Sequence, residues 1–129
     1  MIGPQTFLKA VALSLALTTS ASATGDLHMI FAACAGRTSA ELEHTWLTVG
    51  HGNPQTELIG QRETFASRFE ATRPLGDAKD AFHHRVAAKM VQARLLTLAS
   101  FSDDPARAAR ARALATTEMA RCRRLLLDS

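Results

Sequence analysis

The sequence lacks the short motifs by which many small enzymes and metalloproteins are recognised. It contains no C-x-x-C, C-x-x-C-H or G-x-S-x-G motif, and its five histidines form no H-x-x-x-H or H-E-x-x-H pair. The missing motifs exclude covalent c-type haem attachment and disfavour dithiol redox catalysis, hydrolase-type serine catalysis and a helix-borne zinc site. We therefore expect a non-catalytic protein that holds no metal and no cofactor.

The sequence also lacks the patterns of β-structure and of nucleic-acid binding. Tyrosine is absent, and no segment alternates apolar and polar residues or carries a β-branched run between turns. Ala, Leu, Arg, Glu and Met, which are strong helix formers, dominate instead. The net charge is only +3, and acids are interleaved with the bases, so nucleic acid is not expected as a partner. These features predict an all-α protein.

The N-terminal segment has the three parts of a secretory signal peptide. Lys9 is its only charged side chain, residues 10–17 form a short apolar run, and Ala21-Ser22-Ala23 has the small-x-small pattern of a cleavage site. The run is too short for a comfortable membrane span, which needs about 20 residues. We expect cleavage between Ala23 and Thr24, leaving residues 24–129 as one periplasmic or secreted domain with no stable membrane insertion.

Four helices are predicted in residues 24–129. The first spans 27–49 with Asp26 as its N-cap, and it continues through Gly36 or breaks there and restarts at a capping box of Thr38 and Glu41. The second begins with Asn53 as N-cap and Pro54 as the first helical residue, and it ends near residue 72. The third runs from a cap at Asp77 to about residue 100. The fourth begins at Asp103-Asp104-Pro105.

Each helix carries an apolar stripe at helical spacing, which predicts the face that it turns to the core. The expected buried stripe of the second helix contains Leu58, Phe65 and Phe69. The expected buried stripe of the first helix contains Leu27, Phe31, Cys34, Ala35, Thr38, Leu42, Trp46 and Val49. That of the third helix contains Phe82, Val86, Met90, Ala93 and Thr97. That of the fourth helix contains Ala108, Ala111, Ala115, Met119, Cys122 and Leu126. The third helix is also apolar on its other sides from Val91 onwards, so it is central in the fold or covered by a partner.

The two cysteines of the exported part, Cys34 and Cys122, test this arrangement. Cys34 lies early in the first helix and Cys122 late in the last, both on apolar stripes. In an up-down-up-down bundle these helices are antiparallel neighbours, so the two residues meet at the same height. We expect one intrachain disulfide, with two buried free thiols or an intermolecular bridge as alternatives. A lipid-modified Cys34 is disfavoured because Asp26 and His28 would interrupt the apolar segment before it.

Two groups of side chains are candidate sites. Arg37, Glu41 and His44 lie close together on one face of the first helix, where they form either a small polar surface site or an ordinary solvated face. A metal- or cofactor-binding carrier is the alternative function, with His28, Met29, His83 and His84 as its only candidate ligands.

The segment from Cys34 to Leu47, together with the Arg121-Cys122 context, is similar to small two-cysteine helical proteins exported by Gram-negative bacteria. The resemblance implies a periplasmic setting and a disulfide between the terminal helices, and it brings no catalytic residue. We therefore expect a four-helix up-down-up-down bundle stapled by one disulfide after a cleaved signal peptide. The expected function is that of an interaction, accessory or stress-related protein whose partner is an envelope protein not identified by the sequence. The sequence does not fix the oligomeric state.

Overall fold

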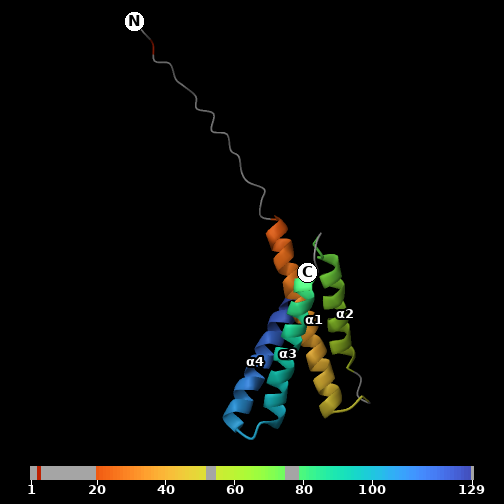
Figure 1. The fold of residues 1–129 in the computed structure, drawn as a ribbon, viewed down its shortest axis with the longest axis vertical. Coiled ribbons are helices and arrows are strands. Elements are labelled where there is room, and N and C mark those ends of the chain that lie inside the picture. Colours follow the sequence, from red (N-terminus) through yellow and green to blue (C-terminus); the bar gives the residue numbers. More distant parts are fainter. Residues whose placement is uncertain (1–2, 4–19, 52–54, 75–78, 129) are drawn as a thin grey trace.

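The computed structural model describes residue 3 and residues 20–51, 55–74 and 79–128, with the backbone alone described over residues 20–25. The described residues form four helices and no strand: α1 (Ser20–Thr48), α2 (Thr56–Ala71), α3 (Lys79–Phe101) and α4 (Pro105–Leu127). They lie side by side along the long axis of the molecule (Figure 1). The all-α helical bundle expected from the composition is confirmed.

Helix α1 is the element that holds the others together, because it packs against each of the other three helices. Its N-terminal half meets the C-terminal end of α2 through His28 and Phe69, so these two helices are antiparallel. It runs parallel to α3, since Glu41 contacts Gln92 and His44 contacts Ser100. Helix α4 packs mainly on α3. Over the described residues the backbones of α2 and α3 are not in contact, and α1 is the one helix that packs against both.

Helix α1 is continuous through Gly36, and the alternative of a break followed by a capping box is wrong. The Thr38 hydroxyl donates to the carbonyl oxygen of Cys34 at 2.7 Å, within the helix, instead of capping a new one. The helix begins at Ser20, so Asp26 lies inside it and is not its N-cap. The expected cleavage site after Ala23 therefore falls within the first turns of α1.

The predicted core stripe of α1 is buried in its middle and exposed at its ends. Phe31, Cys34, Ala35, Thr38 and Leu42 are buried. By contrast, Leu27 and Val49 are exposed, and Trp46 is half-buried with its ring stacked on that of His51. Leu27 is exposed although the adjacent His28 is buried against Phe69, so Leu27 lies on a side of α1 that is not covered. Val49 lies beyond the end of the helix. The predicted stripe is therefore wrong at these two positions.

Helix α2 closes the core on one side of α1. Phe65 and Phe69 are buried as predicted, and they cluster with Phe31 and the disulfide, while Leu58 is half-buried. The helix begins at Thr56 with Gln55 as its N-cap, so the predicted start at Pro54 is wrong. Asn53 and Pro54 themselves, like the expected α3 cap Asp77, lie outside the described residues.

The contact between α1 and α3 is made by very small residues. A Cβ atom at Gly36 would collide with the backbone carbonyl oxygen of Arg85 and lie 3.1 Å from the backbone nitrogen of Lys89. The buried residues of α3 are Ala81, Ala88, Gln92 and Ala99, and none of them belongs to the apolar stripe predicted for this helix. The two backbones approach closely because glycine and alanine leave room, and large side chains would hold them apart.

Helix α4 matches its prediction most closely. The Asp104 carboxylate caps it by accepting hydrogen bonds from the backbone nitrogens of Ala106 and Arg107, with Pro105 in the first turn. Its buried residues are Ala111, Ala115, Met119 and Cys122. Cys122 forms the predicted intrachain disulfide with Cys34, with a Cα–Cα distance of 5.6 Å. The pairing excludes the alternatives of free thiols and an intermolecular bridge in this structure.

Candidate functional site

The most distinctive surface of the molecule is one side of α3. We call Phe82, Val86, Met90, Ala93, Thr97 and Phe101 the outer face of α3. These positions recur every three or four residues and so share one side of the helix. The first five are the residues that the sequence predicted as the core stripe of this helix. That prediction is wrong, because Phe82 is 60% exposed and Met90 66% exposed.

The cause of this error is visible in the packing. Helix α3 has two candidate stripes, one with large apolar side chains and one with alanines and Gln92, and α1 and α4 pack on the second. Gln92 is buried there, and its amide donates to the carboxylate of Glu41 and to the carbonyl oxygen of Ala115, so it joins three helices. The sequence signal that could have identified this buried side is the helical spacing of the small residues Ala81, Ala88 and Ala99 in α3.

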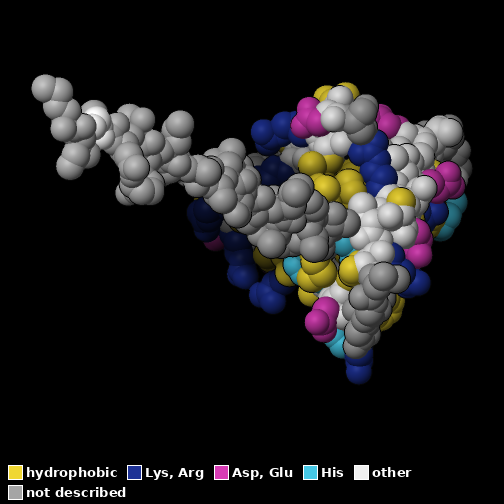
Figure 2. Space-filling view, turned by 90° about the horizontal axis from the view of Figure 1, so that it is seen from above, with side chains coloured by type: hydrophobic (Ala, Val, Ile, Leu, Met, Phe, Trp, Pro, Cys, Tyr) yellow, Lys and Arg dark blue, Asp and Glu magenta, His cyan; other side chains and the backbone are white. Residues whose placement is uncertain are grey.

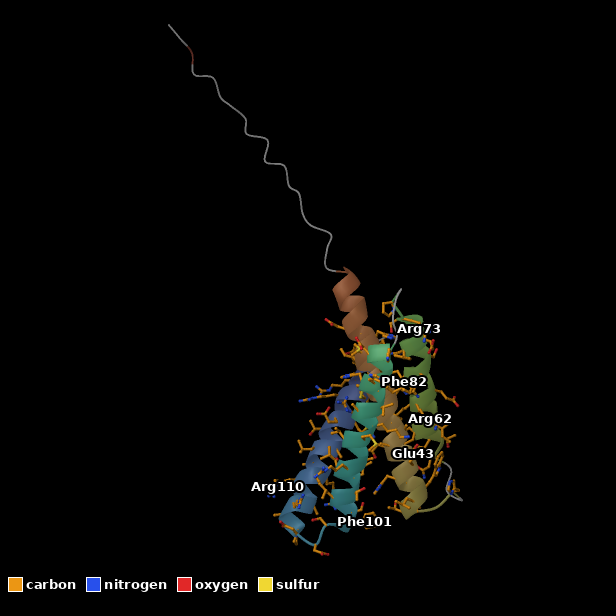
Figure 3. All side chains as sticks on the ribbon, viewed as in Figure 1. Glu43, Arg62, Arg73, Phe82, Phe101 and Arg110 are labelled. Atoms are coloured by element: carbon orange, nitrogen blue, oxygen red, sulfur yellow. A yellow bond between two sulfur atoms is a disulfide. The ribbon has the colours of Figure 1, made fainter. Side chains whose placement is uncertain are left out.

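The outer face of α3 extends along the helix and carries no charged side chain. Figure 3 shows Phe82 and Phe101 near opposite ends of α3, and both are about 60% exposed. On one flank Lys89 pairs with Glu43 of α1 through an Nζ–Oε1 distance of 2.6 Å, and on the other flank Arg94 is exposed one turn after Met90. A contiguous apolar surface of a few hundred Å² on a small protein marks an interaction site more often than a scattered exposed leucine does.

A hollow of about 180 Å³ adjoins this face between α1 and α3. Its lining residues are Ala40, Glu43, His44, Leu47, Ala93 and Thr97. On its rim Leu47 is 74% exposed, and the His44 ring donates to or accepts from the Ser100 hydroxyl at 2.8 Å and lies edge-on to Phe101. The outer face of α3 therefore combines protruding side chains with a neighbouring recess that a side chain of a partner can enter.

The three residues of the predicted polar site take part in three different contacts. Arg37 forms an ion pair with Glu118 of α4, at 3.4 Å between Nη2 and Oε2. Glu41 accepts from Gln92 and lines a polar cavity of about 300 Å³ beside the start of α2. His44 contacts Ser100 at the hollow. Their closeness on the helix surface is real, but each side chain is directed to a different neighbour, and none of the three described cavities contains all three.

A larger cavity, of about 350 Å³, lies beside the disulfide. Its apolar lining consists of Ile30, Ala33, Leu125 and the two cysteines, and its polar lining of Arg37, His84, Glu118 and Arg121. The carboxylate of Glu118 contacts both guanidinium groups, at 3.4 Å to Arg37 and 3.1 Å to Arg121. Because Glu118 offsets much of the charge of the two arginines, the cavity presents no strong anion-binding surface.

Four arginines of α4 lie on the surface of the molecule. Arg107, Arg110, Arg121 and Arg124 are all exposed. Figure 2 shows Lys and Arg side chains gathered at the edge of the molecule on the side where α4 lies. This basic surface is separate from the outer face of α3, because α4 packs on the opposite, alanine-rich side of that helix.

The histidines considered as ligands of a carrier protein have different environments. His83 and His84 are exposed, whereas His28 is buried with 2% of its surface accessible. Its ring stacks on Phe69 with centroids 4.2 Å apart, and its Nδ1–H donates to the Phe69 carbonyl oxygen at 2.8 Å. The other ring nitrogen is buried without a hydrogen-bond partner. Across residues 20–51, 55–74 and 79–128, no three His, Cys, Asp or Glu side chains are grouped to hold a metal ion.

Replacing His28 with alanine is expected to weaken the docking of α2 on α1. The variant loses the buried ring stack and the hydrogen bond to Phe69, so the free energy of unfolding should fall by about 2–3 kcal/mol. Chemical unfolding followed by circular dichroism measures this. The matched control is His83→Ala at an exposed position, which should change stability by no more than about 0.5 kcal/mol. Equal effects of the two substitutions would show that His28 has no structural role.

None of the helical segments that the structure describes is long and apolar enough to cross a membrane. Comparisons with known proteins add no relative: no protein family model, curated protein or solved structure matches this chain.

Proposed function

We propose that this chain is an exported, non-catalytic helical protein that acts by binding another protein chain through the outer face of α3. In this proposal residues 1–23 are the signal peptide, and residues 24–129 work in the periplasm or outside the cell as an up-down-up-down bundle. The observation that carries the proposal is the exposure of Phe82, Val86 and Met90 at successive helical turns, with no charge among them.

The energetics of exposure support a binding role for this face. Burying a large apolar side chain fully contributes about 1.5–3 kcal/mol, so a partner that covers Phe82, Met90 and Phe101 gains substantially. The backbone of α3 is also held in place, since the opposite side of the helix is packed against α1 and α4. A backbone that is already ordered loses little conformational entropy on binding, which favours association.

The proposed export is supported by two independent features. The N-terminal 23 residues have the layout of a signal peptide. Cys34 and Cys122 are joined by a disulfide whose members are 88 positions apart, and such bonds persist in oxidising compartments. An accessory or stress-related role in the envelope is consistent with both.

Photo-cross-linking in the cell of origin tests the binding proposal. A photoreactive residue placed at Phe82 or Met90 should form a covalent adduct with a protein chain on illumination. The control position is Val91, which is 62% exposed but lies on another side of α3. Adducts at Phe82 and Met90 with none at Val91 would support the proposal. The absence of adducts, or equal adducts at all three positions, would contradict it.

A further inference from the structure

We infer that the partner of the outer face of α3 is the same face of a second copy of this chain, bound antiparallel around a two-fold axis. This inference rests on the proposed function and names its partner. Three features of the face argue for it: the pairing of side-chain sizes along it, its charge and its area.

The first feature is the order of large and small residues. The midpoint of the face lies between positions 91 and 92, so an antiparallel register centred there places Met90 opposite Ala93 of the second copy. The same register places Val86 opposite Thr97 and Phe82 opposite Phe101. A two-fold contact contains each pair twice, so the protruding Met90 of each copy meets the small Ala93 of the other, once on each side of the axis.

The hollow beside Ala93 makes this pairing more specific. It has a volume of about 180 Å³ and is lined by Ala93 and Thr97 of α3 and by residues of α1. In the two-fold register Met90 of the second copy comes level with Ala93, which lines this hollow, and methionine is 66% exposed at this position. An unbranched, flexible thioether side chain is well suited to fill such an irregular recess.

The second feature is the charge along the contact. The face itself carries no charged residue, and Lys89 on one flank is neutralised by Glu43 of its own chain. Arg94 lies on the other flank and is exposed. The two-fold axis keeps each flank on one side of the contact, so the Arg94 side chains of the two copies share one edge of it. Both remain in solvent, where salt screens their repulsion, and the charge therefore opposes association only weakly.

The third feature is the area. Phe82, Met90 and Phe101 each expose about 60% of their surface, and Leu47 exposes 74%. Together with Val86 these side chains offer roughly 500 Å² of apolar surface per copy, taking ~200 Å² for a full large side chain. The pair would bury about 1,000 Å², close to the lower limit for a specific interface. We therefore expect a weak dimer, with a dissociation constant on the order of micromolar.

Sedimentation equilibrium of the exported protein, with its disulfide intact, tests the inference. Wild-type protein should show a concentration-dependent equilibrium between monomer and dimer. Met90→Glu should weaken the dimer by at least tenfold, because it buries a charge at the centre of the contact. Val91→Glu, at the next position and of similar exposure, should leave the dimer unchanged. Circular dichroism and thermal unfolding of both variants confirm that each is folded.

Cross-linking of the purified protein tests the register. A photoreactive residue at Met90 should join two copies of the chain, with the attachment mapped to the segment that contains Ala93 and Thr97. A monomer at all concentrations, a dimer that Met90→Glu and Val91→Glu weaken equally, or attachment elsewhere would overturn the inference. If the wild-type protein is monomeric while Met90 captures a different protein in cells, the second-copy inference fails and the proposed function stands. If both experiments give nothing, both fail.

Discussion

Replacing Gly36 with alanine should destabilise the protein by about 3 kcal/mol, although alanine is the better helix former. The added Cβ would collide with the carbonyl oxygen of Arg85, which is backbone and cannot turn aside as a side chain can. Helix α3 would have to move away from α1, and the contacts of Gln92 with Glu41 and of Lys89 with Glu43 would loosen. The midpoint of urea unfolding and the thermal unfolding temperature should both fall.

The matched control is Gly60→Ala in the middle of α2, where a Cβ atom meets nothing within 4 Å. This substitution should stabilise the protein by up to about 1 kcal/mol, because it improves helix propensity without any contact to disturb. The same chemical change is therefore expected to have opposite signs at two helical positions. If Gly36→Ala also stabilised the protein, the close approach of α1 and α3 would be wrong.

Removing the disulfide should have an effect of similar or larger size. The bond joins residues 88 positions apart, and the chain-entropy model gives about 4–5 kcal/mol for closing a loop of this length. A domain of this size has a total stability of about 5–15 kcal/mol, so the double variant Cys34→Ala, Cys122→Ala should lose much of it. Unfolding measurements at 37 °C should show the effect most clearly, because the remaining free energy of unfolding is small at that temperature.

Reduction of the wild-type protein provides an independent check of the disulfide prediction. Unfolding in the presence of a thiol reductant should reproduce the loss seen for the double alanine variant, without any change of sequence. A reduced protein as stable as the oxidised one would show that the contacts of α4 with α3 suffice to hold the bundle. In that case the disulfide would contribute little to the free energy of unfolding.

The parts of the fold that were predictable from sequence are those governed by local signals. Asp104 caps α4 because an acidic residue before Pro105 fits the start of a helix, and the spacing of Ala111, Ala115, Met119 and Cys122 identifies the buried side of that helix. The disulfide was predictable because an even cysteine count in an exported chain and the positions of both residues on apolar stripes point to one pairing.

The buried side of α3 was not predictable from its own periodicity. Its large apolar residues make the stronger stripe, but whether a stripe is buried depends on the surface that packs against it. Here that surface contains Gly36, which lets α1 approach the backbone of α3 at Arg85 and Lys89, and the buried side of α3 carries Ala81, Ala88 and Ala99. The polar group of Arg37, Glu41 and His44 illustrates the same point, because three side chains on one helical face are drawn to partners on two different helices.

The central claim, that the outer face of α3 is covered by another chain when the protein works, is tested most directly by the reactivity of Met90. Met90 is 66% exposed as a residue, whereas Met119 is 2% exposed and serves as the internal reference. Oxidation by peroxide, read by mass spectrometry, should be fast at Met90 in dilute purified protein and several times slower in the native envelope or at high protein concentration. Equal rates of Met90 oxidation under all these conditions would contradict the account.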